Sequence, residues 1–511
     1  MVAQGVLPYQ LEVETRRESL TGLAGLPIYL DLAHVVGLRD AITEHVQVRS
    51  QGWTDAQMLT TLILLNLAGG QCVEDLEKLE TDRGFAQILH RVETFGMPRR
   101  ERRRLERRWR KSRERTVPSV SAMRRYLAAF HDAAQESLRE PGSAFIPSPG
   151  NALSGLSRVN EVCMAFCQRH RAEATATLDM DATLIETQKQ EAFFCYKKFR
   201  AFQPLNVWWA EQQMVVYSEF RDGNVPAGFE QLRVLKQSLD ALPAGVEHVS
   251  MRSDSAGYQW DLLRYCAEGR SERFGVIDFA VSADVSPAFR QAVHEVKEED
   301  WHPLQRYVQG RLVHSDQQWA EVCFVPEGAG SRKTGPSYRF LAIREPLRQL
   351  ELAGMESDQA ELPFPTISYD EADGPRRFKL FGVVTNRDLP GDELIRWHRE
   401  RCGKSEEVHA VMKDDLAGGQ LPSKLFGANA AWWGAMILAL NLNTLMKRLV
   451  LGKGWATKRM KAIRYWVINL PGRLVRHARQ LRLRLSAGHR SAQLLIEARR
   501  TLAAMANGPP G

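Results

Sequence analysis

The sequence predicts a mixed α/β protein whose core is interrupted by a β-rich segment and flanked by helical, basic ends. Three observations support this fold class. Short β-prone runs alternate with helical runs over residues 153–284, as in a sheet that carries helices on its faces. The alternation stops over residues 285–388, where β-prone runs are separated by loops. Apolar residues recur at helical spacing, with abundant arginine, in residues 1–140 and again after residue 389.

The totals of the chain suit a multidomain protein with a polyanionic partner. Its 511 residues allow roughly three domains of about 150 residues each. A hydrophobic fraction of 44% and a charged fraction of 25% are ordinary for a globular protein with a large core. The net charge of +8 suits a nucleic acid or a membrane surface.

The cysteines and the apolar runs predict a cytosolic protein. The seven cysteines have no repeating spacing, which favours reduced thiols over a disulfide framework. Cys163, Cys167 and His170 lie close together, but no second ligand pair of the zinc type follows, so we expect core cysteines on a helix. We expect no signal peptide. The apolar helical runs 58–68 and 432–442 are about 11 residues each, too short to span a bilayer.

The N-terminal part, residues 1–140, is predicted to be helical and to bind DNA. Thr54-Asp-Ala-Gln57 forms a capping-box pattern ahead of an apolar run. Arginine dominates residues 99–115. A solvated helix face would explain this run, but the density of arginine around Trp109 favours phosphate contacts. The predicted DNA contacts here are Arg103, Arg107 and Arg110.

A linker rich in Pro, Gly and Ser is expected at residues 141–152, and the core begins after it. The strand predicted at residues 175–185 has an apolar face and a polar face, and the polar face carries Asp179 and Asp181. An acidic pair on a core strand is unfavourable unless a metal ion or a hydrogen-bond network compensates it. The strand is therefore either an ordinary half-exposed edge strand or a carrier of chemistry.

Two later segments supply further ionisable residues. The strand predicted at residues 246–252 leads into Asp254. The segment at residues 285–388 has the size of a small domain. A long helix is then predicted from Pro390 to about residue 414. On this helix a spacing of three or four residues puts five side chains on one face: Arg399, Cys402, Glu406, His409 and Lys413. A salt-bridged, solvent-exposed surface is the alternative interpretation.

The last part of the chain, residues 451–511, is predicted to be helical and basic after a core segment at residues 389–450. Trp455, Tyr465 and Trp466 are interleaved with its positive charges. Binding to a nucleic-acid backbone explains this pattern, and a helical surface of snorkelling arginines is the alternative. Five arginines recur every two or three residues near the end of this segment: Arg473, Arg476, Arg479, Arg482 and Arg484.

The acidic residues of three separate elements can meet at one place. Side chains at strand ends and on a covering helix share a crevice in α/β sheets, which would bring Asp181, Asp254 and Glu406 together. Three carboxylates repel one another unless divalent cations neutralise them, and oxygen ligands favour Mg²⁺ or Mn²⁺. Two such ions about 4 Å apart activate a water or a 3′-hydroxyl and stabilise the leaving oxygen of an in-line phosphoryl displacement.

The same segments resemble bacterial insertion-sequence transposases of the DDE type, which have a ribonuclease-H-like core. The resemblance rests on Leu178–Thr183, on Met251–Ser255 and on Trp397–Glu406 with Lys413. One branch of this family has a β-rich insertion before the Glu, as here. Its helix carries Tyr, Arg, Glu and Lys, with two, three and six residues between them. Glu406 and Lys413 fit that spacing. The sequence departs from the signature at the Tyr position, which is Arg399, and at the Arg position, which is Cys402.

The resemblance implies roles for individual residues. Asp181, Asp254 and Glu406 would be the catalytic triad and the metal ligands, with Glu407 as a rival to the last. Asp181 is preferred to Asp179, because the family aspartate precedes a small residue and then Thr or Ser, and Asp179 is kept as the secondary candidate. The residues expected to contact DNA near the site are Arg401, which would replace the signature arginine, and Lys413, Arg399 and Arg252.

The function implied by the resemblance is transposition. A transposase with two Mg²⁺ or Mn²⁺ ions would bind the terminal inverted repeats of its element, cleave to leave a 3′-hydroxyl and join that hydroxyl to target DNA. The family also implies a homodimer on paired ends, in the bacterial cytoplasm with the nucleoid and without a membrane. The main rival is a catalytically inactive DNA-binding protein derived from a transposase. A structural nucleic-acid chaperone is a third hypothesis.

Overall fold

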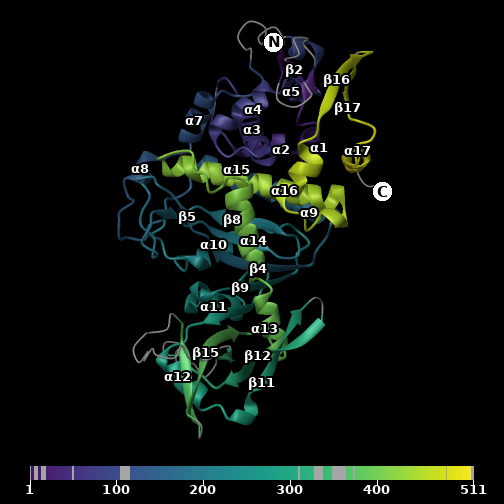
Figure 1. Ribbon diagram of the computed structural model, residues 1–511. Helices are drawn as coiled ribbons and strands as arrows, with labels where there is room; N and C mark the ends of the chain where they lie inside the picture. The colour runs from purple at the N-terminus through teal and green to yellow at the C-terminus, as the bar shows by residue number, and fades with distance from the viewer. Residues whose placement is uncertain are drawn as a thin grey trace. The chain divides into compact units, whose positions relative to one another are not determined.

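A computed structural model describes residues 2–4, 10–12, 19–48, 51–103, 115–308, 311–326, 338–347, 364–371, 374–478 and 480–507 (Figure 1). The chain divides into two compact units. Unit 1 contains residues 1–131, 151–156 and 414–511, and unit 2 contains residues 132–150 and 157–413. The sequence-based boundaries differ from this division, because the apolar helix that we expected to complete the core packs instead with the N-terminal helices of unit 1.

Unit 2 is built on one ten-stranded mixed sheet, which confirms the predicted α/β class. The strand order is β11-β12-β13-β15-β10-β9-β4-β7-β8, and β14 pairs with β15. Strand β4 is parallel to β9, which is parallel to β10, whereas β4, β7 and β8 form an antiparallel meander. These five strands are β4 (Thr175–Ala182), β7 (Leu205–Trp209), β8 (Met214–Glu219), β9 (His248–Ser253) and β10 (Asp278–Ala283).

The β-rich segment extends this sheet instead of forming a sheet of its own. The segment begins with helix α12 (Pro287–His294). Its last strand, β15, pairs antiparallel with β10, so that β10 is hydrogen-bonded to a neighbouring strand along both edges. Ala280 of β10, Leu341 of β13 and Leu394 of the following helix belong to one apolar cluster. The strands of the segment are β11 (His302–Val308), β12 (Arg311–Val322), β13 (Arg339–Pro346), β14 (Thr366–Glu371) and β15 (Gly374–Thr385).

The helix predicted from Pro390 to residue 414 is two helices. Helix α13 (Gly391–Arg399) ends, and α14 (Lys404–Ala410) begins after Gly403, whose φ of 76° favours glycine. A π-helical turn, Val411–Asp415, continues α14. The predicted single face through Arg399 and Glu406 is therefore interrupted between the two helices.

Unit 1 is helical around one buried helix. Helix α15 (Phe426–Leu445) packs on α3 (Asp55–Ala68) and α7 (Val120–Ala128). The capping box of Thr54 and Gln57 at the start of α3 is confirmed. With its π-helical continuation to Leu451, α15 is longer than the predicted apolar run and reaches the length and apolarity of a membrane span, but 72% of its apolar window is buried in the protein, as in a core helix.

The C-terminal part of unit 1 corrects the prediction of a helical segment. Strands β16 (Gly472–His477) and β17 (Gln480–Arg484) form a hairpin, and β16 also pairs with β3 (Leu20–Thr21). Leucine and arginine alternate along β17, and this period of two is typical of a strand. Helix α17 (Ser491–Ala506) follows the hairpin. Arg479 lies outside the described residues.

Candidate active site

Asp181 and Asp254 lie at the same edge of the unit 2 sheet. In the parallel pair β4–β9, Asp179 stands opposite Arg252 and Met180 opposite Ser253. One residue further along each strand come Asp181 and Asp254. Because both strands run in the same direction, their ends meet, and the negative charge of Asp254 acts on Asp181. The structure therefore brings together two of the three predicted acidic residues.

The carboxyl of Asp181 lacks full compensation for its charge. Its side chain is 22% exposed, and Arg401 Nη1 lies 3.9 Å from Oδ2. Burial raises the pKa of Asp181 to about 6, with a further increase from Asp254, while Arg401 and a hydrogen bond from Ser405 act in the opposite direction. A desolvated carboxylate with an acidic neighbour is a place where a cation binds favourably.

Asp254 is held by the short helical turn that it begins. It caps Ser255–Gly257, and its Oδ1 accepts a hydrogen bond of 3.0 Å from the backbone N–H of Ala256. Its side chain is half-buried. The capping bond fixes this carboxylate at the end of β9 and leaves oxygen lone pairs for another ligand.

Glu406 lies in the first turn of α14, beside Ser405. The hydrogen bond of Ser405 to Asp181 brings this turn to the site, but the Glu406 side chain is exposed. Glu407 is exposed as well, so exposure does not separate the two candidates. Among the residues that the structure describes, no three His, Cys, Asp or Glu side chains are grouped closely enough to hold a metal ion. Asp181, Asp254 and Glu406 therefore do not lie close enough together in this structure to bind one metal ion jointly.

Asp179 has different surroundings from Asp181, although both lie on the polar face of β4. It is buried, and its two oxygens accept hydrogen bonds of 2.6 and 3.0 Å from Arg252. Arg252 also donates to the carbonyl of Trp397 at 2.6 Å and lies 3.2 Å from Glu400 Oε2. These bonds join β4, β9 and α13. Arg252 was predicted to contact DNA, but its side chain is 1% exposed and its donors are engaged in the interior.

The other predicted basic contacts lie in several environments. Arg399 donates to Gln317 Oε1 at 2.7 Å, and burial lowers its pKa. Arg401 is buried, and its Nε atom has no hydrogen-bond partner among the described residues. Lys413 Nζ lies 3.4 Å from the carbonyl of Leu184, just after β4. In unit 1, Arg103 is exposed, whereas Arg107 and Arg110 lie outside the described residues.

His398 is a site neighbour that the sequence analysis missed. It is buried, and its Nε2 donates to the carbonyl of Ser253, the residue before Asp254, at 3.1 Å. Burial lowers the pKa of His398 to about 3, with help from Arg401 and Arg252, so the ring is neutral. Its position directly after Trp397 in the family-like segment was a signal that could have identified it.

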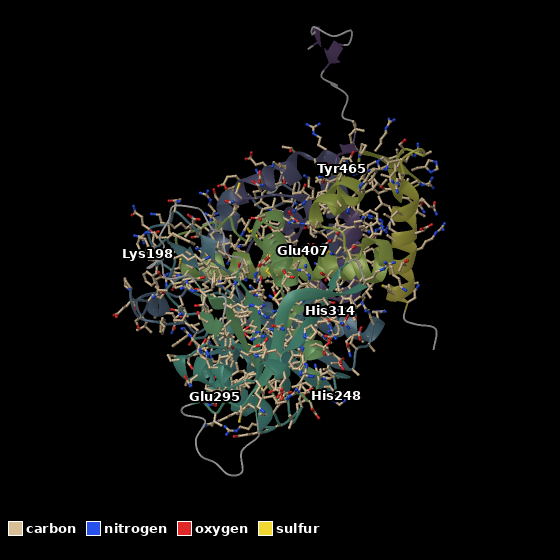
Figure 2. All side chains as sticks on the ribbon, turned by 60° about the horizontal axis from the view of Figure 1, so that its bottom comes forward. Lys198, His248, Glu295, His314, Glu407 and Tyr465 are labelled. Atoms are coloured by element: carbon tan, nitrogen blue, oxygen red, sulfur yellow. The ribbon has the colours of Figure 1, made fainter. Side chains whose placement is uncertain are left out.

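A basic, aromatic hairpin tip in unit 2 was also missed. Phe194 forms an antiparallel bridge with Arg200, and the left-handed Lys198 (φ 66°) closes the turn (Figure 2). Arg200 donates to the carbonyls of Gln190 and Ala192, which fixes the base of the tip. Tyr196 remains 74% exposed. Exposed aromatic rings beside lysines are typical of nucleic-acid contacts, and the run of aromatic and basic residues in the sequence carries that signal.

A model of one protein family matches most of this chain. The family model described as "Transposase DDE domain group 1" matches residues 5–328 and 370–507. A search of curated proteins found no match. Among solved structures, the chain is similar to a piggyBac transposase studied by cryo-EM as a synaptic complex with hairpin DNA. The identity is 12%, the TM-score is 0.41, and the match covers 87% of this chain and 78% of that one. Because the family model matches most of its length, the chain belongs to group 1 of the DDE-domain transposases.

Proposed function

We propose that this protein is a transposase that cleaves DNA at the ends of an insertion sequence and joins the freed 3′-hydroxyl to target DNA by in-line phosphoryl transfer. One observation carries the proposal: Asp181 and Asp254 lie side by side at the ends of parallel strands, in a chain of the DDE family. Carboxylates at the ends of neighbouring strands are a common way to present metal ligands in a crevice. The strand order β8-β7-β4-β9-β10 supports a ribonuclease-H-like core.

Asp181, Asp254 and Glu406 are the proposed ligands of two Mg²⁺ or Mn²⁺ ions. Three carboxylates offer oxygen donors, which these cations prefer, and the raised pKa of Asp181 indicates a negative charge that a cation would compensate. The bound ions would activate the attacking hydroxyl and stabilise the leaving oxygen. Glu406 is the proposed third ligand because Ser405, its neighbour in α14, already reaches Asp181.

The surrounding side chains are proposed to position these carboxylates. The pair of Asp179 and Arg252 fixes β4 against β9, and the bond from Arg252 to the carbonyl of Trp397 fixes α13 on both. Neutral His398 holds the end of β9 just before Asp254. Asp179 is thus assigned a supporting role. Arg401 and Lys413, which lie beside Asp181 and the segment after β4, are proposed to contact the DNA backbone at the scissile phosphate.

The partners proposed are double-stranded DNA, as terminal inverted repeats and as target, and a second copy of the chain on paired ends. The protein would act in the bacterial cytoplasm, with the nucleoid. A second function, DNA binding without cleavage, is favoured by one observation. In the part of the chain that the structure describes, Glu406 does not lie close enough to the two aspartates to form a metal-binding group with them. The two functions differ in whether DNA is cut.

The test is Mg²⁺-dependent nicking of DNA that contains the ends of the element. We expect Asp181→Ala, Asp254→Ala and Glu406→Gln each to lower the rate by at least about a thousand-fold, because a metal-held transition state loses several kcal/mol. Binding of the same DNA in EDTA should be unchanged. Asp240→Ala, an exposed aspartate in unit 2, is the matched control.

Two outcomes would decide against the assignments. Cutting at the wild-type rate by the triad variants would refute the catalytic role. Binding of the ends by every form, wild type included, with cutting by none would establish the binding-only function. Glu407→Gln separates the neighbouring glutamates: loss of cutting there, with activity kept in Glu406→Gln, would reassign the third ligand.

A further inference from the structure

One stretch of unit 1, residues 416–496, is unusually basic because it contains no acidic residue. Between Asp415 and Glu497 the chain has no Asp or Glu, and fourteen residues are Lys or Arg. At the whole-chain frequency of 61 acidic residues in 511, about ten would fall in this stretch. Every charge on the surface formed by this stretch is therefore positive, which is the electrostatic pattern of a polyanion-binding surface.

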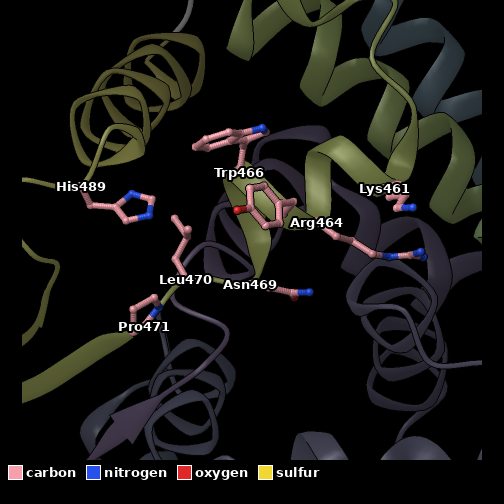
Figure 3. Close-up of a pocket in the computed structure, with 8 residues that line it drawn as sticks. Lys461, Arg464, Trp466, Asn469, Leu470, Pro471 and His489 are labelled. Atoms are coloured by element: carbon pink, nitrogen blue, oxygen red, sulfur yellow. The ribbon is translucent and has the colours of Figure 1, made fainter.

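A pocket opens in this surface where the helix loses its regular geometry. Helix α16 (Met460–Ile463) continues as a π-helical turn, Arg464–Ile468, and such turns are frequent at functional sites. The pocket has a volume of about 480 Å³ (Figure 3). Its lining includes Lys461, Arg464, Tyr465, Trp466, Asn469 and His489.

Two aromatic rings face this pocket and remain accessible. Tyr465 is 69% exposed (Figure 2), and Trp466 is 36% exposed. Their ring centroids are 4.9 Å apart, at an interplanar angle of 87°. The guanidinium of Arg490 lies over the Trp466 ring, 5.4 Å from its centroid. Large rings of this kind usually bury their faces, so an exposed pair flanked by cations is suited to stacking with a flat ligand.

The base of the pocket is fixed from inside. Arg464 Nε donates to the carbonyl of Leu67 at 3.0 Å, and its Nη2 donates to the carbonyls of Asn66 at 2.7 Å and of Asp415. Since the Arg464 guanidinium is engaged with the backbone, it positions the turn and is not offered to a ligand. Lys461 supplies a mobile cation at the rim, and the exposed amide of Asn469 supplies a donor and an acceptor.

The hairpin that follows Pro471 extends the positive surface. Arg473 of β16 stands directly opposite Arg484 of β17, and Arg482 lies opposite Val475. Side chains two residues apart share a face of a strand, so the three arginines lie on one face of the hairpin. Three guanidinium groups on one face suit phosphate, which arginine binds through charge-assisted hydrogen bonds.

We propose that this surface binds DNA and that the pocket holds one unpaired nucleotide. The base would stack on the face of Tyr465, with the perpendicular ring of Trp466 against its side, its polar edge toward Asn469 and a flanking phosphate at Lys461. The hairpin arginines would contact the adjoining backbone. A base inside an intact duplex is covered on both faces by its neighbours, so the rings can accept only an unpaired one. The inference rests on the proposed function for the identity of DNA as the partner, but it does not require cleavage.

The test uses the full chain in EDTA with two duplexes that differ by a single unpaired 2-aminopurine. Stacking on the rings should quench the 2-aminopurine fluorescence on binding. We expect Tyr465→Ala and Trp466→Ala to lose the quenching and about ten-fold in affinity for the duplex with the unpaired base, and to bind the fully paired duplex as the wild type does. Tyr465→Phe keeps the ring and should behave as the wild type.

The results separate this inference from the proposed function. Quenching that depends on Tyr465, in a protein that never nicks DNA, would support the pocket and refute the transposase activity. Normal nicking, with unchanged quenching and affinity in Tyr465→Ala and Trp466→Ala, would overturn the pocket alone. Equal loss of affinity for both duplexes would also overturn it, because the rings would then act on the backbone or on folding.

Discussion

The acidic edge of unit 2 and the basic surface of unit 1 use arginine in opposite ways. In unit 2, Arg252 is buried against Asp179 at the acidic edge, and Arg399 is half-buried and bonded to Gln317. On the basic surface, Arg473 and Arg484 are exposed and stand opposite each other, with no carboxylate in the surrounding sequence. The net charge of +8 for the whole chain therefore does not describe the local charge of either region. A buried carboxylate makes Arg252 part of the fold, whereas Arg473 and Arg484 are directed to solvent.

This difference predicts different consequences for removing an arginine. An arginine paired in the interior leaves an uncompensated charge when it is removed, whereas the contacts of an exposed arginine contribute little to stability. The first kind of change should act on stability and the second on DNA affinity. Three predictions test this separation, in order of decreasing effect.

The largest effect is expected for Arg252→Ala. The change leaves the Asp179 carboxylate buried without its two hydrogen bonds, which costs about 3–5 kcal/mol in the free energy of unfolding. Urea unfolding followed by circular dichroism measures the loss. Arg473→Ala on the hairpin should change stability by no more than about 0.5 kcal/mol.

A double variant sharpens the same comparison. Asp179→Leu combined with Arg252→Met removes both charges and should regain most of the lost stability, because apolar side chains can replace a buried pair. If Arg252→Ala unfolds at the same urea concentration as the wild type, the pair is not a structural support and our assignment of Asp179 is wrong.

A smaller effect is expected from acid, through His398. Its pKa is lowered to about 3 in the folded protein, so the unfolded chain binds a proton near pH 6.5 that the folded chain does not. Stability contributed by the neutral ring is complete above pH 6.5 and is lost as the pH falls toward 3. At pH 5 the loss from this residue is about 2 kcal/mol.

The measurement compares urea unfolding of the wild type and His398→Gln at pH 7 and pH 5. Glutamine keeps a donor for the carbonyl of Ser253 but does not titrate, so the variant should lose less stability between the two pH values. An equal loss in both proteins would show that His398 is not the acid-sensitive group at this edge.

The local patterns of the sequence predicted the acidic strands well. The alternation around Asp179 and Asp181 gave a strand, and the segment before Asp254 gave another, since a period of two is a local property. The capping box at Thr54 was predicted for the same reason. Their parallel pairing brings the two aspartate positions to one edge.

Features that depend on distant partners could not be predicted in this way. The sequence shows that Arg252 is charged but not that it is buried, because its partner Asp179 lies 73 residues away. The pairing of β15 with β10 converted an expected separate domain into an extension of the sheet. The left-handed Gly403 divided one predicted helix into two. In β17, leucine alternates with arginine, and this period of two indicates a strand. The prediction of a helix relied instead on the high frequency of arginine in this part of the chain.

The smallest effect on stability, but a clear effect on binding, is expected for the hairpin triple variant Arg473→Gln, Arg482→Gln and Arg484→Gln. Each lost phosphate contact should reduce the slope of log affinity against log salt by about 1, and the affinity for paired duplex should fall by about ten-fold or more at low salt. Unfolding stability should change by no more than about 0.5 kcal/mol per residue, because all three side chains are exposed. Fluorescence anisotropy over a range of salt concentrations measures the slope.

The matched control replaces three exposed cations of unit 2, Lys236, Arg290 and Lys297, by glutamine. Both triple variants lower the net charge equally, so a general effect of charge would reduce the slope equally in the two proteins. A reduction confined to the hairpin variant would show that the position of the arginines, and not their number, directs DNA to this surface. Equal slopes would mean that the absence of carboxylates between Asp415 and Glu497 has no specific role in binding.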